Sequence, residues 1–176
     1  AMTELLLNHL GGQWIAGTGA GTTLHDPVLG DALVRVDSTG LDLSAHFERV
    51  RTRAGAALRA MSYRERAGLL KAIVAVLQAN RDAYDAISTA NSGTVRSDSA
   101  VDIDGAIYTV GVYAKLGEML GDARVLADGD LVSLAKGGAF GSRHVQVPTR
   151  GLALFINAFN FPSWGLWEKA APALLS

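Results

Sequence analysis

Five consecutive apolar residues, Leu-Ala-Leu-Phe-Ile at positions 152–156, precede a turn-like Asn-Ala-Phe-Asn-Phe-Pro segment near the end of the chain. Because these apolar residues do not alternate with polar ones, the run is typical of a strand buried on both faces of a parallel sheet. Pro162, two positions after Asn160, suits the first turn of a helix, and Pro172 is expected to kink or end that helix. The segment therefore predicts a strand, turn and helix of an α/β fold.

Four helices are expected in the middle of the chain, where apolar residues recur with a period of about 3.6. The first has Asp42 or Ser44 as its expected N-cap. The second begins with Ser62 three residues before Glu65, which is the pattern of a capping box. The expected ranges are 42–61, 62–80, 81–90 and 98–120.

The sequence on either side of these helices predicts strands. Residues 11–36 place short apolar pairs between Gly and Asp-Pro, which indicates a β-hairpin arm with turns near 17–21 and 26–31. The Gly-Thr-Gly-Ala-Gly of the first turn has no buried strand before it and no helix after it, so we interpret it as a flexible turn and not a dinucleotide-binding loop. Beyond Gly121 we expect further strands, with Val145 and Val147 on a half-exposed one.

Composition excludes several classes of function. Sixteen Lys and Arg against 17 Asp and Glu provide no basic footprint for nucleic acid or an anionic membrane. The absence of cysteine excludes a disulfide framework, a zinc finger and a thiol nucleophile within these residues. No window approaches a membrane span and the first residues do not form a secretory signal, so a cytoplasmic location is expected. The mean hydropathy of +0.20 indicates apolar surface that a partner or further chain would cover.

Other polar residues do not form a site in the sequence pattern. The four histidines lack the spacing of metal ligands, so no metal site is expected. Asp102 and Asp104, two positions apart, point to different faces of a helix and cannot act as paired carboxylates. A basic run is favoured as a solvated helix face over a clamp for CoA phosphates, and comprises Arg49, Arg51, Arg53 and Arg59.

A functional site is expected near residues 157–163, because α/β folds bind ligands beyond the carboxyl ends of their strands. Asn160 has two interpretations there. Its side chain could cap the following helix, or its amide could donate a hydrogen bond to an oxygen that becomes negative during a reaction. The residues alone leave both open.

The run from Phe155 to Leu174 resembles the Asn-Phe-Pro segment of the aldehyde dehydrogenase family. Residues 11–36 resemble that family's N-terminal arm, with Gly-x-Trp followed by Pro-x-x-Gly. The details are most similar to a branch that oxidises CoA-linked semialdehydes in benzoate and phenylacetate degradation. The fold class implied is α/β, the N-terminal part of the aldehyde dehydrogenase fold. Its expected parts are an extended β arm (1–40), a helical part of the cofactor-binding domain (41–122), strands of the oligomerisation region (123–150), and the first strand and helix of a Rossmann-like parallel sheet (151–176).

The resemblance also implies a reaction and roles for particular residues. In that family a cysteine thiolate attacks the aldehyde, an asparagine and a backbone N–H hold the oxyanion, hydride passes to NAD(P)+, and a glutamate activates water. Asn160 is implied as the oxyanion donor. Lys169 is implied to support proton transfer, with a solvated helix lysine as the alternative. The nicotinamide-ribose side of an NADP+ or NAD+ site is implied at Ile156, Asn157, Ala158 and Phe159.

Two positions depart from the family pattern, in which Trp usually precedes the asparagine. Phe159 stands there, and Ala158 stands in place of Pro, so a slightly different turn is expected.

The cysteine, the glutamate and the phosphate-binding parts follow this region in relatives, and the resemblance implies that the chain is the N-terminal portion of a longer homodimeric enzyme, inactive alone. The expected substrate is a small aldehyde, in this branch a CoA thioester. The alternative is a non-catalytic binding or assembly module that reuses the half-fold.

Overall fold

The computed structural model describes residues 3–176 and begins with two antiparallel hairpins. β1 (Asn8–Leu10) pairs with β2 (Gln13–Ile15), and β3 (Thr22–His25) pairs with β4 (Ala32–Val36). The turn between β3 and β4 is closed by Asp26, whose carboxylate accepts hydrogen bonds from the backbone N–H groups of Val28 (2.8 Å) and Leu29 (2.9 Å). The predicted hairpin arm and its second turn are confirmed.

The glycine-rich turn at residues 17–21 connects the two hairpins and leads into strand β3, not into a helix. Its backbone is held by the segment after β4. The N–H of Gly19 donates to the Asp37 carboxylate at 2.6 Å, and that of Thr18 donates to the carbonyl of Thr39 at 3.0 Å. The interpretation of this run as a turn is therefore confirmed.

The predicted helices form close to their expected bounds. The first is continuous but changes pitch, as α1 (Leu43–Arg49), a π-helical stretch η1 (Val50–Ala54) and α2 (Gly55–Ala60). It is followed by α3 (Tyr63–Ala79), α4 (Arg81–Ser92) and α5 (Arg96–Leu120).

Local capping explains where these helices begin and end. Of the two expected N-caps of α1, the structure uses Asp42, which accepts the N–H of Ala45 at 2.9 Å. Ser62 and Glu65 form both bonds of the predicted capping box. Helix α4 ends at Gly93, whose left-handed φ of 66° suits a glycine after a helix.

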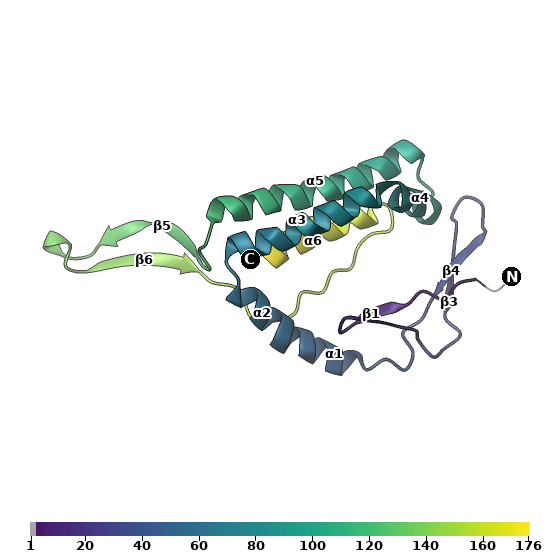
Figure 1. The fold of residues 1–176 in the computed structure, drawn as a ribbon, viewed down its shortest axis with the longest axis horizontal. Coiled ribbons are helices and arrows are strands. Elements are labelled where there is room, and N and C mark those ends of the chain that lie inside the picture. Colours follow the sequence, from purple (N-terminus) through teal and green to yellow (C-terminus); the bar gives the residue numbers. More distant parts are fainter. Residues whose placement is uncertain (1–2) are drawn as a thin grey trace.

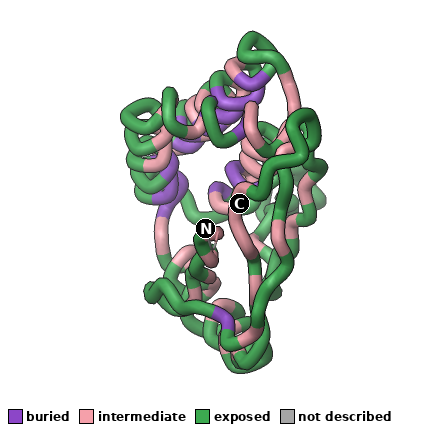
Figure 2. The backbone as a smooth tube through the Cα atoms, turned by 90° about the vertical axis from the view of Figure 1, so that its right-hand side faces the viewer, coloured by how far each residue is buried: buried purple, intermediate pink, exposed green. Residues whose placement is uncertain are grey.

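The core lies between α3, α5 and α6 (Pro162–Leu175), which run side by side (Figure 1). Gly117 of α5 lets the other two helices come close, since a Cβ there would lie 2.6 Å from Leu175 Cδ1 and 2.9 Å from Ala67 Cβ. Figure 2 shows that most of the buried residues lie on helices. The core cluster comprises Tyr63, Leu70, Val110, Ala114, Ala171 and Leu175.

A long antiparallel hairpin projects away from the helices (Figure 1). It consists of β5 (Leu126–Ser133) and β6 (Gly141–Gln146), which confirms strands after Gly121. Apart from Leu126, all residues of the two strands are exposed. Val145 lies in β6, as predicted, and is 54% exposed, whereas Val147 follows the end of β6 and is 63% exposed. The hairpin therefore has no covered face in the described chain.

The predicted parallel strand at residues 152–156 is wrong for this structure. The described chain contains three two-stranded antiparallel sheets and no parallel sheet. Residues 151–158 are extended but pair with no strand, and Leu154 and Ile156 are 74% and 84% exposed. A strand needs a neighbouring strand to take its backbone hydrogen bonds, and none of the strands within residues 3–176 pairs with this run. The architecture is thus a helical core with antiparallel hairpins.

Pro162 occupies the first turn of α6, as expected, but Pro172 does not end that helix. Helix α6 continues through Pro172 to Leu175, and the carbonyl of Pro172 accepts the N–H of Ser176 at 2.9 Å. Proline cannot donate a backbone hydrogen bond, so Pro172 removes one bond from the helix, and α6 ends three residues later. Within residues 3–176, no helix is both long and apolar enough to cross a membrane.

Candidate functional site

The candidate site lies where the extended segment enters helix α6. The N-cap position of α6 is Phe161, whose side chain makes no capping hydrogen bond. The first N–H groups of the helix are bound instead by Asp102 of α5. Its Oδ1 accepts from Trp164 at 2.8 Å and its Oδ2 from Ser163 at 3.3 Å. A distant carboxylate therefore caps α6.

Asp102 is fully buried, and its environment explains how a carboxylate can be there. Besides the two N–H groups of α6, its Oδ2 accepts a hydrogen bond from Ser88 Oγ of α4 at 3.2 Å. A negative charge is favourable at a helix N-terminus, where the unsatisfied N–H groups carry partial positive charge. Asp104 lies on another face of α5 and pairs with Arg81, so the prediction that the two aspartates do not act as a pair is confirmed.

The sequence contained a signal for Asp102 that our reasoning missed. Asp102 lies on the helical stripe of Ala106, Val110 and Ala114, all of them buried. A carboxylate on such an apolar stripe must have buried partners, because an unpaired buried charge is strongly unfavourable. The pattern could have indicated a buried cap, but it could not have indicated which helix is capped.

Asn160 is exposed, and no side-chain hydrogen bond found among residues 3–176 involves it. Its backbone, in contrast, is held on both sides. Immediately before it, the carbonyl of Phe159 accepts a hydrogen bond from Ser92 Oγ at 2.7 Å, and shortly after it Asp102 binds the first turn of α6. Of the two interpretations of Asn160, capping of α6 is not what the structure shows, because Asp102 does this.

The other predicted site residues divide into exposed and half-buried ones. Ile156 and Phe159 are 84% and 77% exposed, and Ala158 is exposed too. Asn157 is half-buried, and its Oδ1 is buried without a hydrogen-bond partner among the described residues. The structure therefore leaves three apolar side chains and one buried acceptor along this stretch.

Lys169 lies one turn after Gly165 on α6 and bends back along its own helix. Its Nζ donates to the carbonyl of Gly165 at 2.7 Å and pairs with Glu168 at 3.1 Å. Asn157 reaches the same place, since a Cβ on Gly165 would lie 3.8 Å from Asn157 Oδ1 and 3.9 Å from Lys169 Nζ. The structure thus brings Asn157 and Lys169 together beside Gly165.

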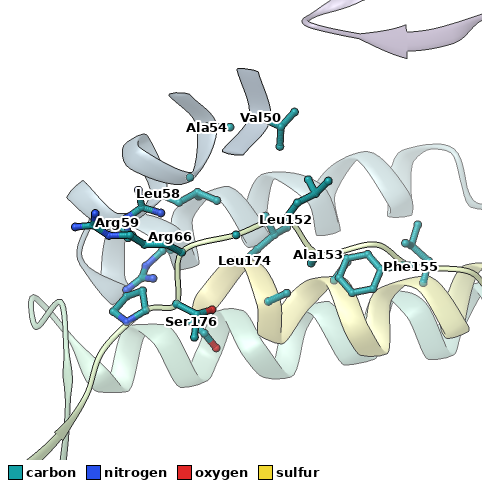
Figure 3. Close-up of a pocket in the computed structure, with 18 of the residues that line it drawn as sticks. Val50, Ala54, Leu58, Arg59, Arg66, Leu152, Ala153, Phe155, Leu174 and Ser176 are labelled. Carbon is teal, nitrogen blue, oxygen red and sulfur yellow. The ribbon is translucent and has the colours of Figure 1, made fainter. Parts of the chain in front are cut away.

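A cavity of about 580 Å³ lies between α2, the segment after Pro148 and α6 (Figure 3). Its lining includes Leu152, Ala153 and Phe155 but none of residues 156–160, so it is separate from the predicted site. Arg59 and Arg66 lie toward one end of it and Phe155 toward the other. Sequence reasoning did not find this cavity.

Arg66 is a buried cation at that cavity, with 2% of its surface exposed. Its guanidinium carbon lies 4.6 Å from the centre of the Tyr63 ring, and this cation–π contact offsets part of the cost of burial. Its Nε and Nη2 have no hydrogen-bond partner within the part of the chain that is described. Arg66 lies four residues before Leu70 on the apolar stripe of α3, and this spacing is the sequence signal that could have indicated its burial.

The chemistry available at the candidate site is hydrogen-bond donation. Asn160 presents an exposed amide, which can donate a hydrogen bond to an oxygen that carries or develops negative charge. The chain contains no cysteine. Among residues 3–176, no three His, Asp or Glu side chains gather closely enough to hold a metal ion.

The chain belongs to the aldehyde dehydrogenase family, whose sequence model matches residues 14–176. It is 54% identical over 171 residues to the 3,4-dehydroadipyl-CoA semialdehyde dehydrogenase of Aromatoleum evansii. That alignment covers 97% of this chain and 33% of the relative, so the chain spans about a third of the length of the curated relative that it matches.

Solved structures share the fold at low sequence identity. A 3,6-anhydro-L-galactose dehydrogenase superposes with a TM-score of 0.80 at 18% identity, over 98% of this chain and 34% of that one. A betaine aldehyde dehydrogenase mutant of Staphylococcus aureus, in complex with NAD+, superposes with a TM-score of 0.78 at 17% identity. The match covers 99% of this chain and 34% of that one. An NADP-dependent enzyme of E. coli superposes with a TM-score of 0.76 at 22% identity, and the match covers 99% of this chain and 34% of that one. This likeness establishes that the chain has the fold of the N-terminal third of such enzymes.

Proposed function

We propose that these residues form the N-terminal third of an NAD(P)+-dependent aldehyde dehydrogenase that oxidises a CoA-linked semialdehyde to the carboxylic acid. The observation that carries the proposal is the 54% identity, over 97% of the chain, to an enzyme named for that substrate class. The nucleophile and the water-activating base would come from the polypeptide outside these residues, because the chain has no cysteine. The 176-residue chain alone is then inactive.

Asn160 is the proposed oxyanion donor. When a nucleophile attacks the aldehyde carbon, the carbonyl oxygen becomes an oxyanion, and a fixed amide N–H aimed at it stabilises the transition state more than the ground state. The exposed amide, with its backbone held on both sides, supports this role.

The residues before Asn160 are proposed to face the nicotinamide-ribose part of NADP+ or NAD+, which accepts the hydride when bound. Ile156 and Phe159 offer exposed apolar surface suited to a flat ring. Asn157, half-buried between these apolar residues, is the polar side chain of the stretch and is proposed to lie on the ribose side. Lys169 is proposed to assist proton transfer. The observation in favour of this role is that Lys169 and Asn157 both lie beside Gly165.

The projecting hairpin β5–β6 is proposed to contact a second copy in a homodimer of the complete enzyme. Its exposed side chains include Leu131 (70%), Val132 (59%) and Phe140 (64%), an apolar surface that a partner subunit would cover. On this proposal residues 123–150 belong to an oligomerisation region. Residues 41–122 and 151–176 belong to the cofactor-binding domain.

A hybrid enzyme tests the proposal. In it, this chain replaces the aligned third of the Aromatoleum evansii dehydrogenase, to which it is 54% identical. We expect the hybrid to reduce NADP+ or NAD+ with a CoA-linked semialdehyde, and Asn160→Ala to lower its kcat roughly 100- to 1000-fold with little change in KM. A folded hybrid without dehydrogenase activity would contradict the proposed function. Unchanged kcat in Asn160→Ala would contradict only the role of Asn160.

The competing function is a non-catalytic binding or assembly module, which the absence of cysteine favours. The two proposed functions, module and dehydrogenase, predict different sizes for the natural protein. A mass near 18.4 kDa for the protein purified from its natural source would favour the module. A species about three times heavier that contains cysteine would favour the dehydrogenase.

A further inference from the structure

We propose that Asp102, together with Ser92, is a positioning residue for Asn160. This inference rests on the proposed role of Asn160 as the oxyanion donor. Neither residue would touch the substrate. They would act by fixing the backbone on both sides of Asn160, so that its amide is already aimed before the reaction begins.

Two helices supply the contacts. From α4, Ser92 Oγ donates to the carbonyl of Phe159 at 2.7 Å, on the N-terminal side of Asn160. From α5, Asp102 accepts the N–H groups of Ser163 and Trp164, on the C-terminal side. Only the four residues 160–163 separate the backbone groups held at Phe159 and Trp164, so little freedom remains at Asn160.

The two helices are themselves joined at this point. Ser88, one turn before Ser92 on α4, donates to Asp102 Oδ2 at 3.2 Å. One turn after Asp102 on α5, Gly105 receives the Trp164 ring, since a Cβ there would lie 2.8 Å from Trp164 Cδ2. A polar contact and a packing contact thus fix the same first turn of α6.

Full burial of Asp102 argues for positioning in preference to stability. Burying a charge costs free energy even when it is hydrogen-bonded, and apolar residues of similar volume often stabilise a fold as well or better. A carboxylate does what an apolar residue cannot do, since it ties two N–H groups of α6 to one point. Catalysis by a fixed donor needs that kind of placement, because misplacement by about 1 Å can cost 100-fold in rate.

A double-mutant cycle in the hybrid enzyme tests the inference. We expect Asp102→Asn to lower kcat roughly 10- to 100-fold with little change in KM. In the Asn160→Ala background the same change should alter kcat by less than about two-fold, because the group that it positions is gone. Asp98→Asn, one turn earlier on the same helix, is the matched control and should leave kcat unchanged, because Asp98 is exposed and no side-chain hydrogen bond found among the described residues involves it.

Amide hydrogen exchange on the 176-residue chain provides a readout that does not depend on catalysis. Asp102→Asn should speed exchange at Ser163 and Trp164 and leave the centre of α3 unchanged. If Asp102→Asn prevents folding, Ser92→Ala is used in its place, because Ser92 is only half-buried and its removal should leave the chain folded. In the double-mutant cycle, Ser92→Ala should then lower kcat only in the enzyme that retains Asn160.

Two results would overturn the inference. One is an equal loss of kcat from Asp102→Asn, or from its substitute Ser92→Ala, with and without Asn160. The other is no loss at all in the enzyme that retains Asn160. Failure of the proposed role of Asn160 is a different result, because Asn160→Ala alone would then retain kcat. Failure of the proposed function is different again, because the folded hybrid would then have no dehydrogenase activity.

Discussion

Arg81 of α4 and Asp104 of α5 are joined by two parallel hydrogen bonds, Nε to Oδ1 and Nη2 to Oδ2, each 2.7 Å long. This paired geometry is the strong form of an arginine–carboxylate contact. The hydrogen bond from Arg81 is the main reason why the pKa of Asp104 lies below its usual value, and the same bond raises the pKa of Arg81. The pair links the two helices that hold the entry to α6.

The first prediction concerns acid. Because the folded pKa of Asp104 is lower than its unfolded pKa of about 3.9, the pair stabilises the fold fully above that pH. This contribution is lost as the pH falls through the folded pKa. We expect Asp104→Asn to lose stability at pH 7 and to show a shallower further loss below about pH 4, as measured by urea unfolding across that range. Asp82→Asn is the control, because Asp82 is 3.7 Å from Arg81 and its side chain is 93% exposed. An equal acid slope in Asp104→Asn and in the unmutated chain would contradict this prediction.

The second prediction compares two glycines of α5. A Cβ on Gly117 would lie 2.6 Å from Leu175 Cδ1 and 2.9 Å from the carbonyl oxygen of Tyr63, whereas one on Gly111 would meet nothing within 4 Å. Gly117→Ala should therefore destabilise the chain by about 1–3 kcal/mol, since overpacking outweighs the gain in helix propensity. Gly111→Ala should stabilise it by up to about 1 kcal/mol. Denaturant midpoints of both variants measure this, and a similar shift in both would mean that α6 can move away from α5.

The third prediction concerns the start of α3. Ser62 accepts the N–H of Glu65 at 3.2 Å, and the N–H of Ser62 donates to Glu65 Oε2 at 2.7 Å. Ser62→Ala removes the first bond and should cost about 0.5–2 kcal/mol in the free energy of unfolding. Ser97→Ala, in the exposed first turn of α5, is the control and should stay within about 0.5 kcal/mol. Equal effects of the two changes would show that the cap contributes nothing.

The fourth prediction concerns the sign of the charge at the candidate site. In the hybrid enzyme, Asn160→Asp should lower kcat more than Asn160→Ala does. An ionised carboxylate has no proton to donate and repels the developing oxyanion, whereas alanine only removes a donor. Single-turnover rates of hydride transfer at pH 7 compare the two. A higher rate for Asn160→Asp than for Asn160→Ala would mean that the oxyanion does not form beside this side chain.

Features set by neighbouring residues could be predicted from the sequence. The capping box at Ser62, the turn at Asp26 and the start of α6 at Pro162 each depend on contacts within a few positions. The strand predicted at residues 152–156 depends on neighbours to pair with, and the described chain supplies none.

In the candidate site, too, the local feature could be predicted from the sequence and the long-range contact could not. Asn160 was found by its motif, but Asp102 lies 61 positions before Ser163, to which it is bonded. Its apolar stripe could indicate that it is buried, whereas only the packing of α5 against α6 determines what it caps. The cavity beside Arg66 likewise needs α2, α6 and the segment between them in place.

The extended run that ends in Ile156 has a consequence for handling the 176-residue chain. Residues 151–158 pair with no strand in the described chain, and they carry no charged side chain and no proline. Backbone N–H and C=O groups in such a run can bond to the same run of another molecule, which is how aggregates with a cross-β repeat begin. Arg150 and Pro148 on one side and Pro162 on the other are the only residues nearby that oppose such growth. Solutions of this chain should therefore lose monomer with rising concentration, first through this unpaired segment.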